Sequence, residues 1–537
     1  MVRNAIDVMH VTKNLCVNLL GFLGVYGKSK DTPEARADQK HVKGRAGMHP
    51  SLFEGPGSYA LTKAEKEIFF ECLRSIKVPS GYSSNIKGII NMAEKKFQNL
   101  KSHDCHVIMT QLLPVALRGL LPDNVRLAIV KLCAFLNAIS QKVINPDDLP
   151  KLQKDVVQCL VSFELLFPPS FFNIMTHLLV HLVEEIEILG PVFLHNMFPF
   201  ERFMGVLKNY VRNRARPEGS MSKGRETEEV IEFCVDFLPH VRPIGVPQSR
   251  HEGRLSGKGT LGKKAMGCTD GLSFNKAHYT VLQSSILVAP YIQEHKNIVR
   301  TNNPGKSDSW IAEHHMETFG SWLRTQLMDD DDVGEELYLL AKQPSSTILT
   351  FKGYEINGNT FYTFAQDQRS TNQNSGVRFD AATDNERKDT YYGYIDEIWE
   401  LDYAPTFKVP LFRCKWVKMT GVKVDEQYGM TMVDLNNLGY LDEPFVLAKD
   451  VAQVFYVKDM DSKPKRKRKN KQINTSNNEP KCHIVLSGKR NIMGVEDKTD
   501  MSEDYNQFGE IPPFAVKTDP SIALNNEDAP WLRPKRS

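Results

Sequence analysis

NVRLAIVKLCAFLNAISQKV, residues 124–143, is the stretch that decides the fold class of the first half of this chain. Apolar residues recur there at spacings of three and four, which is the period of a helix with one buried face. Turn signals lie on both sides of it, LPDN at 121–124 and NPDD at 145–148. The stretch therefore predicts an amphipathic helix with defined ends.

The same period extends in both directions from this helix. It predicts further helices at 7–23, 62–73, 84–100, 105–119, 147–166 and 170–189. We therefore expect a helical domain over 51–238. A single helix and a charged segment precede it in residues 1–50, which we interpret as the remnant of another domain.

The pattern changes after residue 238. Residues 239–275 are rich in Gly, Arg, Lys and Ser, and two short helical patterns follow them, so 239–345 is expected to be a linker with short helices. From residue 347 the apolar period is two, in short aromatic strands, which predicts a small antiparallel β-barrel-like module over 346–460. Residues 461–537 are polar and basic and are expected to be disordered. The predicted class is an α + β multidomain protein.

Composition excludes several protein classes. The 537 residues carry a net charge of only +3, so an argument for nucleic acid must rest on where the cations cluster. Nine cysteines, an odd number without C-x-x-C spacing, favour reduced thiols in a cytosolic or nuclear protein. The apolar run at 107–121 is interrupted by Pro114 and Arg118, so no membrane span is expected.

The segment FPFERFMGVLKNYVRNRARPEG at 198–219 joins an acidic residue at a predicted helix start to a basic strip. Metal-assisted phosphodiester chemistry needs carboxylates to hold the metal, and Lys or Arg hold the phosphates. Glu201 is therefore a candidate catalytic residue. The candidate nucleic-acid contacts are Lys208, Arg212, Arg214 and Arg216. A solvated helix surface is the alternative interpretation of both.

Three histidine-containing patterns are weaker signals. Asp7 and His10 lie one turn apart and could flank a metal or a scissile phosphate, which makes Asp7 a second catalytic candidate. Asp7 could equally cap the first helix or interact with Lys13. His177 and His181 have the spacing of two imidazoles on one helix face, but we favour packed, hydrogen-bonded core residues there over a metal site. The third pattern, HDCH at 103–106, sits at a predicted helix start, where Asp104 is expected to act as a cap; a metal site is the less favoured alternative, because no second ligand pair lies nearby in the sequence.

A dense basic run, KPKRKRKNK, occupies residues 463–471. It is interpreted as a nuclear import signal, and a DNA-binding tail or a plain solvated linker are the alternatives. The cations concerned are Lys463, Lys465, Arg466, Lys467, Arg468, Lys469 and Lys471.

Several blocks occur in the order known from one family. They are IDVMHVTKN at 6–14, 23–30, LLPVALR at 112–118, FNIMTHLLVHL at 172–182, 199–219, GYEING at 353–358, NSGV at 374–377, and 392–457. Together they resemble the C-terminal part of a plant CACTA (En/Spm-like) transposase with its two C-terminal domains of unknown function.

The resemblance implies an RNase H-like catalytic region in which three acidic residues hold two divalent metals. It implies that residues 1–50 are the remnant of that region, that Glu201 is the third acid, and that Asp7 is a weaker candidate. The first acid is expected upstream, so no cofactor is firmly predicted; Mg²⁺ would bind if a complete core were present.

The function expected from this resemblance is that of a C-terminal fragment or degenerate copy of the transposase, nucleic-acid binding and catalytically incomplete. The expected partners are DNA at the transposon ends and either a second copy or a companion transposon protein, in the nucleus. A non-catalytic DNA- or protein-binding adaptor derived from the transposon is the alternative.

Overall fold

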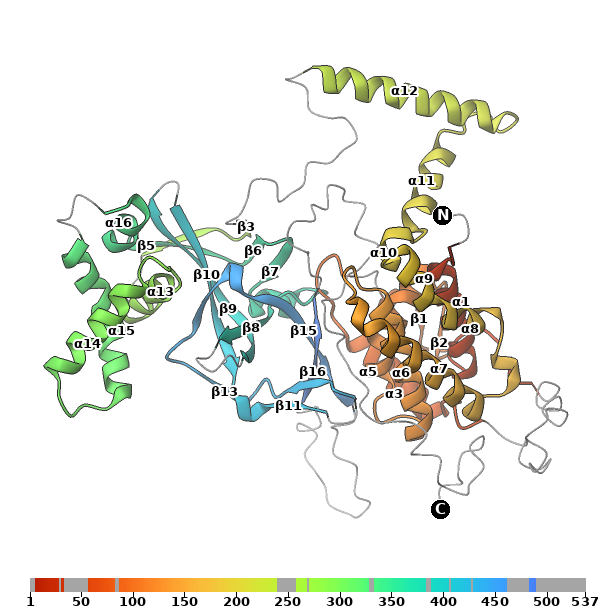
Figure 1. The fold of residues 1–537 in the computed structure, drawn as a ribbon, viewed down its shortest axis with the longest axis horizontal. Coiled ribbons are helices and arrows are strands. Elements are labelled where there is room, and N and C mark those ends of the chain that lie inside the picture. Colours follow the sequence, from red (N-terminus) through yellow and green to blue (C-terminus); the bar gives the residue numbers. More distant parts are fainter. Residues whose placement is uncertain are drawn as a thin grey trace, which may run out of the picture.

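The structure is a computed structural model that describes residues 5–28, 30–32, 57–82, 86–238, 257–267, 270–327, 333–382, 388–404, 407–425, 428–460 and 482–488. A helical half formed by the residues up to 238 stands beside an antiparallel sheet formed by later residues (Figure 1). The predicted α + β class, with the helices first, is confirmed.

The helix predicted at 124–143 is α6, Asp123–Ile139, and it is buried on nearly all sides rather than on one face. Such a helix belongs in the interior of a bundle. The other helices of this half are α1 Val8–Phe22, α3 Lys63–Ser75, α4 Ser102–Val107, α5 Leu113–Ala116, α7 Leu149–Leu166, α8 Ile174–Leu178, α9 Leu182–Leu189, α10 Val192–His195, α11 Phe198–Asn209 and α12 Pro217–Phe237.

A π-helical turn, Ile108–Leu112, joins α4 to α5. Pro114 follows it and has no N–H to donate to the carbonyl oxygen of Thr110, four residues earlier. The buried Asn137 side chain on α6 supplies a donor instead, with 3.1 Å between its Nδ2 and Thr110 O. A side chain from the neighbouring helix thus satisfies the polar group that the proline leaves open.

The first helix shares the core of the later ones. Phe22 of α1 makes edge contacts with Tyr59, Phe167 and Phe171, with ring centroids 5.4–6.0 Å apart. The predicted remnant at 1–50 is therefore packed into the helical half through α1.

The helix predicted at 84–100 is wrong. The structure has a 3₁₀ turn, Ile86–Ile89, followed by a hairpin of β1, Ile90–Asn91, and β2, Lys96–Phe97. Asn91 Oδ1 accepts hydrogen bonds from the backbone N–H groups of Ala93 and Glu94, which closes a turn where a helix would continue.

The sheet is built around a long hairpin of β9, Lys388–Ala404, and β10, Phe407–Val417. The order of its main path is β11-β12-β16-β15-β8-β9-β10-β13, and the pairing of the described strands does not close into a barrel. The remaining strands are β3 Lys258–Leu261, β4 Lys264–Gly267, β5 Thr347–Phe351, β6 Gly353–Ile356, β7 Asn359–Tyr362, β8 Gly376–Ala382, β11 Val422–Val424, β12 Thr431–Val433, β13 Leu438–Gly439, β14 Phe445–Leu447, β15 Ala452–Lys458 and β16 His483–Ser487.

A two-residue turn joins two of these strands. β6 and β7 pair through Asn357 and Gly358, whose φ angles of 51° and 71° suit a two-residue hairpin turn. A short helix, α17 Phe364–Arg369, follows this hairpin.

The region predicted as a linker is part of the sheet half. β4 pairs with β5, and β3 pairs with β6. Four helices share one apolar core with β9, β10 and β14 (Figure 1), and the second of them joins it by packing on the third: α13 Gly271–Gln283, α14 Ala289–Asn302, α15 Asp308–Leu327 and α16 Glu335–Lys342. The Gly- and Lys-rich composition concealed these two strands.

The prediction of a disordered tail over 461–537 is wrong for β16. This strand pairs with β15 and β12, and its Ile484 and Leu486 are buried in the core of the helical half. The apolar run HIVLS at 483–487 is the signal that sequence reasoning passed over.

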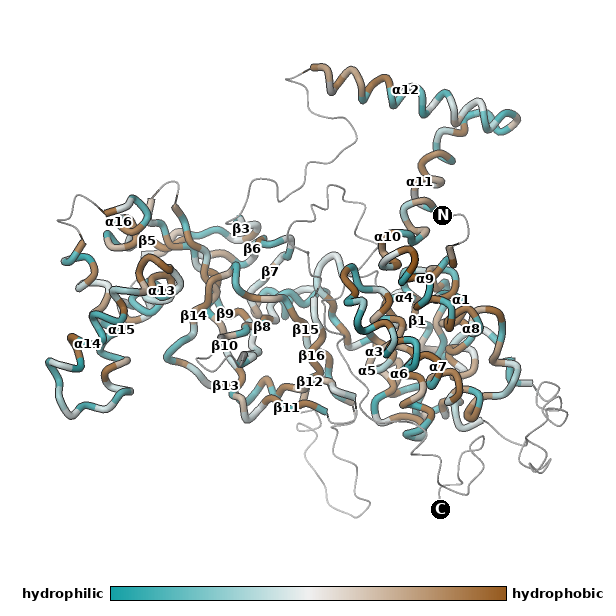
Figure 2. The backbone as a smooth tube through the Cα atoms, viewed as in Figure 1, coloured by the Kyte–Doolittle hydropathy of each residue, from teal (hydrophilic) through white to brown (hydrophobic). Residues whose placement is uncertain are grey.

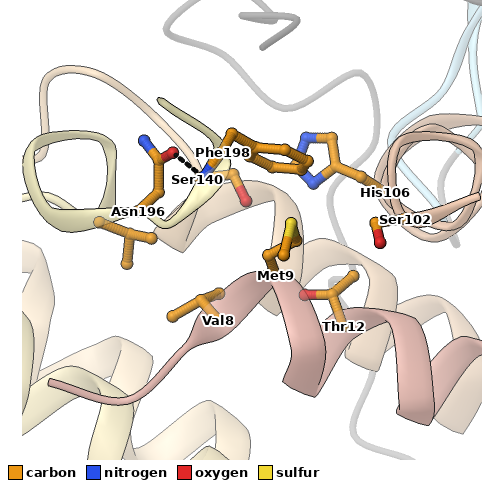
Figure 3. Close-up of a pocket in the computed structure, with 9 residues that line it drawn as sticks. Val8, Met9, Thr12, Ser102, His106, Ser140, Asn196 and Phe198 are labelled. Carbon is orange, nitrogen blue, oxygen red and sulfur yellow. Dashed lines mark hydrogen bonds between the residues drawn. The ribbon is translucent and has the colours of Figure 1, made fainter. Parts of the chain in front are cut away.

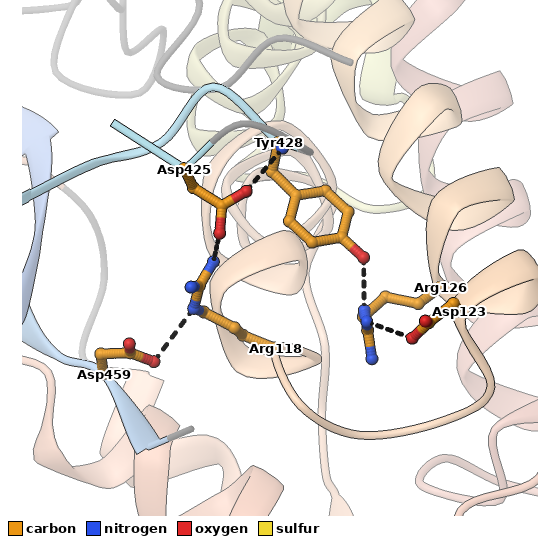
Figure 4. A network of polar contacts seen from close by, with 6 residues as sticks. All are labelled: Arg118, Asp123, Arg126, Asp425, Tyr428 and Asp459. Atoms are coloured by element: carbon orange, nitrogen blue, oxygen red, sulfur yellow. Dashed lines mark hydrogen bonds and ion pairs between the residues drawn. The ribbon is translucent and has the colours of Figure 1, made fainter. Parts of the chain in front are cut away.

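A buried polar network also joins the two halves (Figure 4). Arg118, after α5, donates to Asp425 Oδ2 at 2.6 Å and to Asp459 Oδ1 at 3.1 Å, and all three side chains are at most 15% exposed. Beside it, Arg126 of α6 donates to the hydroxyl oxygen of Tyr428. Because isolated buried charges are costly, these pairs fix how the sheet sits on the helices.

Candidate functional site

The two acidic candidates, far apart in sequence, meet on opposite sides of one histidine. His10 Nδ1 lies 2.5 Å from Asp7 Oδ2, and His10 Nε2 lies 3.9 Å from Glu201 Oε1. Asp7 is also the N-cap of α1, because its Oδ1 accepts the backbone N–H of His10. Asp7 therefore both caps α1 and contacts the His10 ring.

Local structure explains this meeting. Ile6 N–H donates to Glu185 Oε1 of α9 at 2.7 Å, which ties the start of α1 to the helices that lead into α11. Glu201 lies in the first turn of α11. The missing N–H of Pro199 costs no hydrogen bond in this turn, and the positive end of the helix dipole stabilises the carboxylate there. The role of Glu185 as an anchor had no signal in the sequence.

The cluster orients an imidazole between two carboxylates. A ring that donates Nδ1–H to Asp7 presents its Nε2 toward Glu201, an arrangement suited to moving a proton or to holding one polar ligand. The ring also keeps the two carboxylates apart. In the described parts of the chain, no group of three or more His, Cys, Asp or Glu side chains is placed to hold a metal ion.

A small pocket adjoins this cluster (Figure 3). It is shallow and open to solvent, with room for about one water molecule. Its lining includes Val8 and Met9, next to Asp7, and Phe198, one turn before Glu201. His106 also lines it, and burial lowers the pKa of His106 to about 3, so this ring is neutral at pH 7. The remaining lining residues are Thr12, Ser102, Ser140, Val192 and Asn196.

The four candidate phosphate contacts lie on a projection rather than around the pocket. Figure 1 shows α11 rising from the helical half and α12 turning across its end. Lys208 is on α11, and the three arginines lie between the helices in residues 210–216, which we call the elbow. The side chains of Lys208, Arg212, Arg214 and Arg216 are exposed, and within the described ranges no ion pair is seen for any of them.

The elbow is held by local contacts. Asn213 Oδ1 accepts from Ala215 N–H at 3.0 Å, and Ser220 Oγ accepts from Asn213 N–H at 3.2 Å. The Tyr210 ring packs on Gly224 so closely that a Cβ there would lie 2.6 Å from the ring. None of these three contacts involves an arginine side chain, so the guanidinium groups stay available for phosphate.

The histidine pair on α8 and the following turn is hydrogen-bonded as expected, but it is not in the core. His177 Nε2 and His181 Nε2 lie 3.2 Å apart, and both rings are exposed. The expectation of core residues was wrong because Leu179, two residues from each histidine, is the one that is fully buried in the core, with Leu178 packed against it.

Two predictions concern other properties of the chain. Residues 463–471, with the seven cations of the predicted import signal, lie outside the described residues. In the described ranges, none of the helices combines the length and apolar composition that crossing a bilayer requires.

Comparison with known proteins finds two family models. The first, Domain of unknown function (DUF4218), matches residues 139–251, which contain α7 to α12. The second, Domain of unknown function (DUF4216), matches residues 399–467, which contain β10 to β15. Domains of these two kinds are typical of plant transposase-like proteins. No curated protein and no solved structure matches the chain.

Proposed function

We propose that this chain is a C-terminal part or degenerate copy of a CACTA-type DNA transposase that binds nucleic acid and does not complete a catalytic centre by itself. The observation that carries the proposal is the exposed basic strip of Lys208, Arg212, Arg214 and Arg216 on the projection formed by α11 and the elbow. The two matched domains support it, because they follow the order of the blocks that resemble the transposase.

The residues present do not fit a two-metal centre. Such a centre needs several carboxylates that converge on ions about 3.5–4 Å apart. Asp7 and Glu201 are instead separated by the ring of His10, and the Asp7 carboxylate is occupied by the imidazole and the helix cap. We therefore derive no step through Mg²⁺.

This mismatch also favours a second candidate, an adaptor derived from the transposon that binds DNA or protein without chemistry. Both candidates share the nucleic-acid contact at Lys208 and the elbow arginines. They differ in whether the chain contributes to strand cleavage when the rest of a catalytic region is supplied.

Cleavage is the first test. The purified chain, incubated with supercoiled plasmid and Mg²⁺ or Mn²⁺, is expected to leave the plasmid intact because its acidic ligands are incomplete. Cutting that the Glu201→Ala variant abolishes would refute this expectation. Cutting that persists in the variant would come from another source.

DNA binding is the second test. Replacing Arg212, Arg214 and Arg216 by alanine is expected to weaken duplex binding on unrelated sequences alike. The slope of log affinity against log salt should flatten by about 0.9 for each phosphate that the variant no longer neutralises. Fluorescence anisotropy between about 50 and 200 mM salt measures both quantities.

A matched variant controls for the removal of charge. Arg324, Lys342 and Arg369 are exposed cations of the sheet half, and changing them to alanine removes the same charge away from the elbow. This control should bind DNA with the wild-type slope. Equal effects of the two triple variants would reject a contact at the elbow.

A further inference from the structure

The arm formed by α11, the elbow and α12 exposes large apolar side chains on both helices. On α11, Phe200, Phe203 and Met204 are 54%, 44% and 61% exposed. On α12, Val230, Phe233 and Phe237 are 57%, 72% and 78% exposed. Figure 2 shows α12 hydrophilic near the elbow and hydrophobic toward its far end.

These side chains form a stripe on each helix. Phe200, Phe203 and Met204 lie within one turn of one another, and Val230, Phe233 and Phe237 follow each other at three and four residues. Since a Phe side chain buries 150–250 Å², the six residues offer roughly 700 Å² of apolar surface per copy. That area approaches the roughly 800 Å² per partner of a standard protein interface.

The sequences of the two segments that hold the stripes carry opposite net charge. Residues 198–216 hold five cations, Arg202, Lys208, Arg212, Arg214 and Arg216, and one carboxylate, Glu201. Residues 226–237 hold five carboxylates, Glu226, Glu228, Glu229, Glu232 and Asp236, and no Lys or Arg. Lys223 and Arg225, just before this segment, pair with the first three of them on the same exposed helix, so the segment keeps an excess of negative charge. The far half of α12 therefore suits a partner helix that is apolar and basic, and α11 with its elbow has that composition.

An antiparallel alignment of α11 with α12 matches both features at once. With Phe200 level with Phe237, Met204 is level with Phe233, Leu207 with Val230, and Lys208 with Glu229. The elbow arginines then lie beyond the apolar match and remain free for another ligand.

The helices of one chain do not make this match. A tight hairpin through the elbow would bring 200–204 level with 222–226, which include Ser222, Lys223 and Arg225 and no large apolar residue. The packing of Tyr210 on Gly224 also holds α12 turned away from α11 (Figure 1). The matching helix must come from another molecule.

We propose that the acidic, apolar half of α12 of one copy packs antiparallel on α11 of a second copy of this chain. The proposal does not depend on DNA binding or on the identity of the catalytic residues. It predicts self-association of the purified full chain at micromolar concentration, driven by Phe200, Met204, Phe233 and Phe237.

Complementation of two variants tests the proposal. One variant carries Phe200→Ser and Met204→Ser on α11, and the other carries Phe233→Ser and Phe237→Ser on α12. Each alone is expected to sediment as a monomer, because each lacks one side of the interface. An equimolar mixture should associate again, since it combines one intact α11 with one intact α12. Circular dichroism should be unchanged, because the substituted side chains are exposed.

Three results would overturn the proposal. A wild-type chain that stays monomeric throughout the micromolar range would remove its basis. If the α11 variant alone still associates and the α12 variant alone is monomeric, then α12 pairs with α12 and not with α11. Two monomeric variants that do not associate on mixing would mean that the stripes do not meet each other.

Cross-linking fixes the register. Cys234 of α12 is exposed, and the alignment places it level with Phe203 of the other copy. A Phe203→Cys variant, prepared as a mixture of isotopically light and heavy chains, should give a mixed peptide joining residues 203 and 234 with a short bismaleimide. The same variant with Cys234→Ser should not. Absence of the mixed peptide despite association would contradict the register.

Discussion

At the scale of single residues, the clearest electrostatic feature is Asp367, a buried carboxyl at the contact between the two halves. Its Oδ2 accepts the backbone N–H groups of Asn374 and Ser375 at 2.8 and 2.7 Å. Its Oδ1 is buried, and no partner for it is found in the described residues. Burial outweighs the hydrogen bonds and raises the pKa of Asp367 from 3.8 to about 6.

This raised pKa predicts a pH dependence of stability. The Asp367 carboxyl holds its proton more tightly in the folded chain than in the unfolded chain. The stability that this protonated carboxyl contributes is therefore fully present below pH 3.8 and is lost as the pH rises to about 6. Urea unfolding of the wild type relative to Asp367→Asn, across this pH window and up to neutral pH, measures the effect. The free energy of unfolding of the wild type should fall relative to that of Asp367→Asn as the pH rises to about 6, and the difference between the two should then stay constant. A difference that does not vary with pH would contradict the prediction.

At the scale of elements, the interface between the helices and the sheet rests on Arg118. Its partners Asp425 and Asp459 follow strands β11 and β15, so one guanidinium holds two parts of the sheet half. Removing one member of a buried ion pair leaves the other charge buried and unpaired.

Arg118→Ala is therefore expected to destabilise the chain by about 3 kcal/mol or more. Arg225→Ala is the control, because Arg225 pairs with Glu228 and Glu229 on an exposed face of α12. An exposed pair contributes at most about 1 kcal/mol. Denaturant unfolding compares the two variants, and similar small decreases in the free energy of unfolding would mean that the network does not hold the halves together.

Elements were predicted best where a long apolar period lay between turn signals, as at α6 and α7. Prediction failed where local side-chain bonds decided the backbone, as at Asn91, and where short strands gained their apolar partners from distant parts of the chain, as at β16. The candidate residues were visible by type. Their arrangement was not, since tertiary packing alone brings Asp7, His10 and Glu201 together.

At the scale of the whole molecule, the proposed function requires entry into the nucleus. Residues 463–471 contain seven cations in nine positions, a density that import receptors and phosphate backbones both recognise. The peptide fused to an inert reporter too large to diffuse through nuclear pores is expected to carry that reporter into the nucleus. The same fusion with its seven cations changed to alanine should stay outside. A cytoplasmic wild-type fusion would instead favour the DNA-tail interpretation.

Binding of DNA phosphates at the elbow is what the proposed function most depends on, and hydrogen–deuterium exchange with and without duplex DNA measures it at that segment. We expect DNA to slow exchange of the backbone amides at 208–220 at low salt, and this protection to vanish at high salt and in the triple arginine variant. Amides of α14 and α15 should exchange at the same rate with and without DNA. Unchanged exchange at 208–220, under conditions where the chain binds DNA, would contradict a phosphate contact at the elbow.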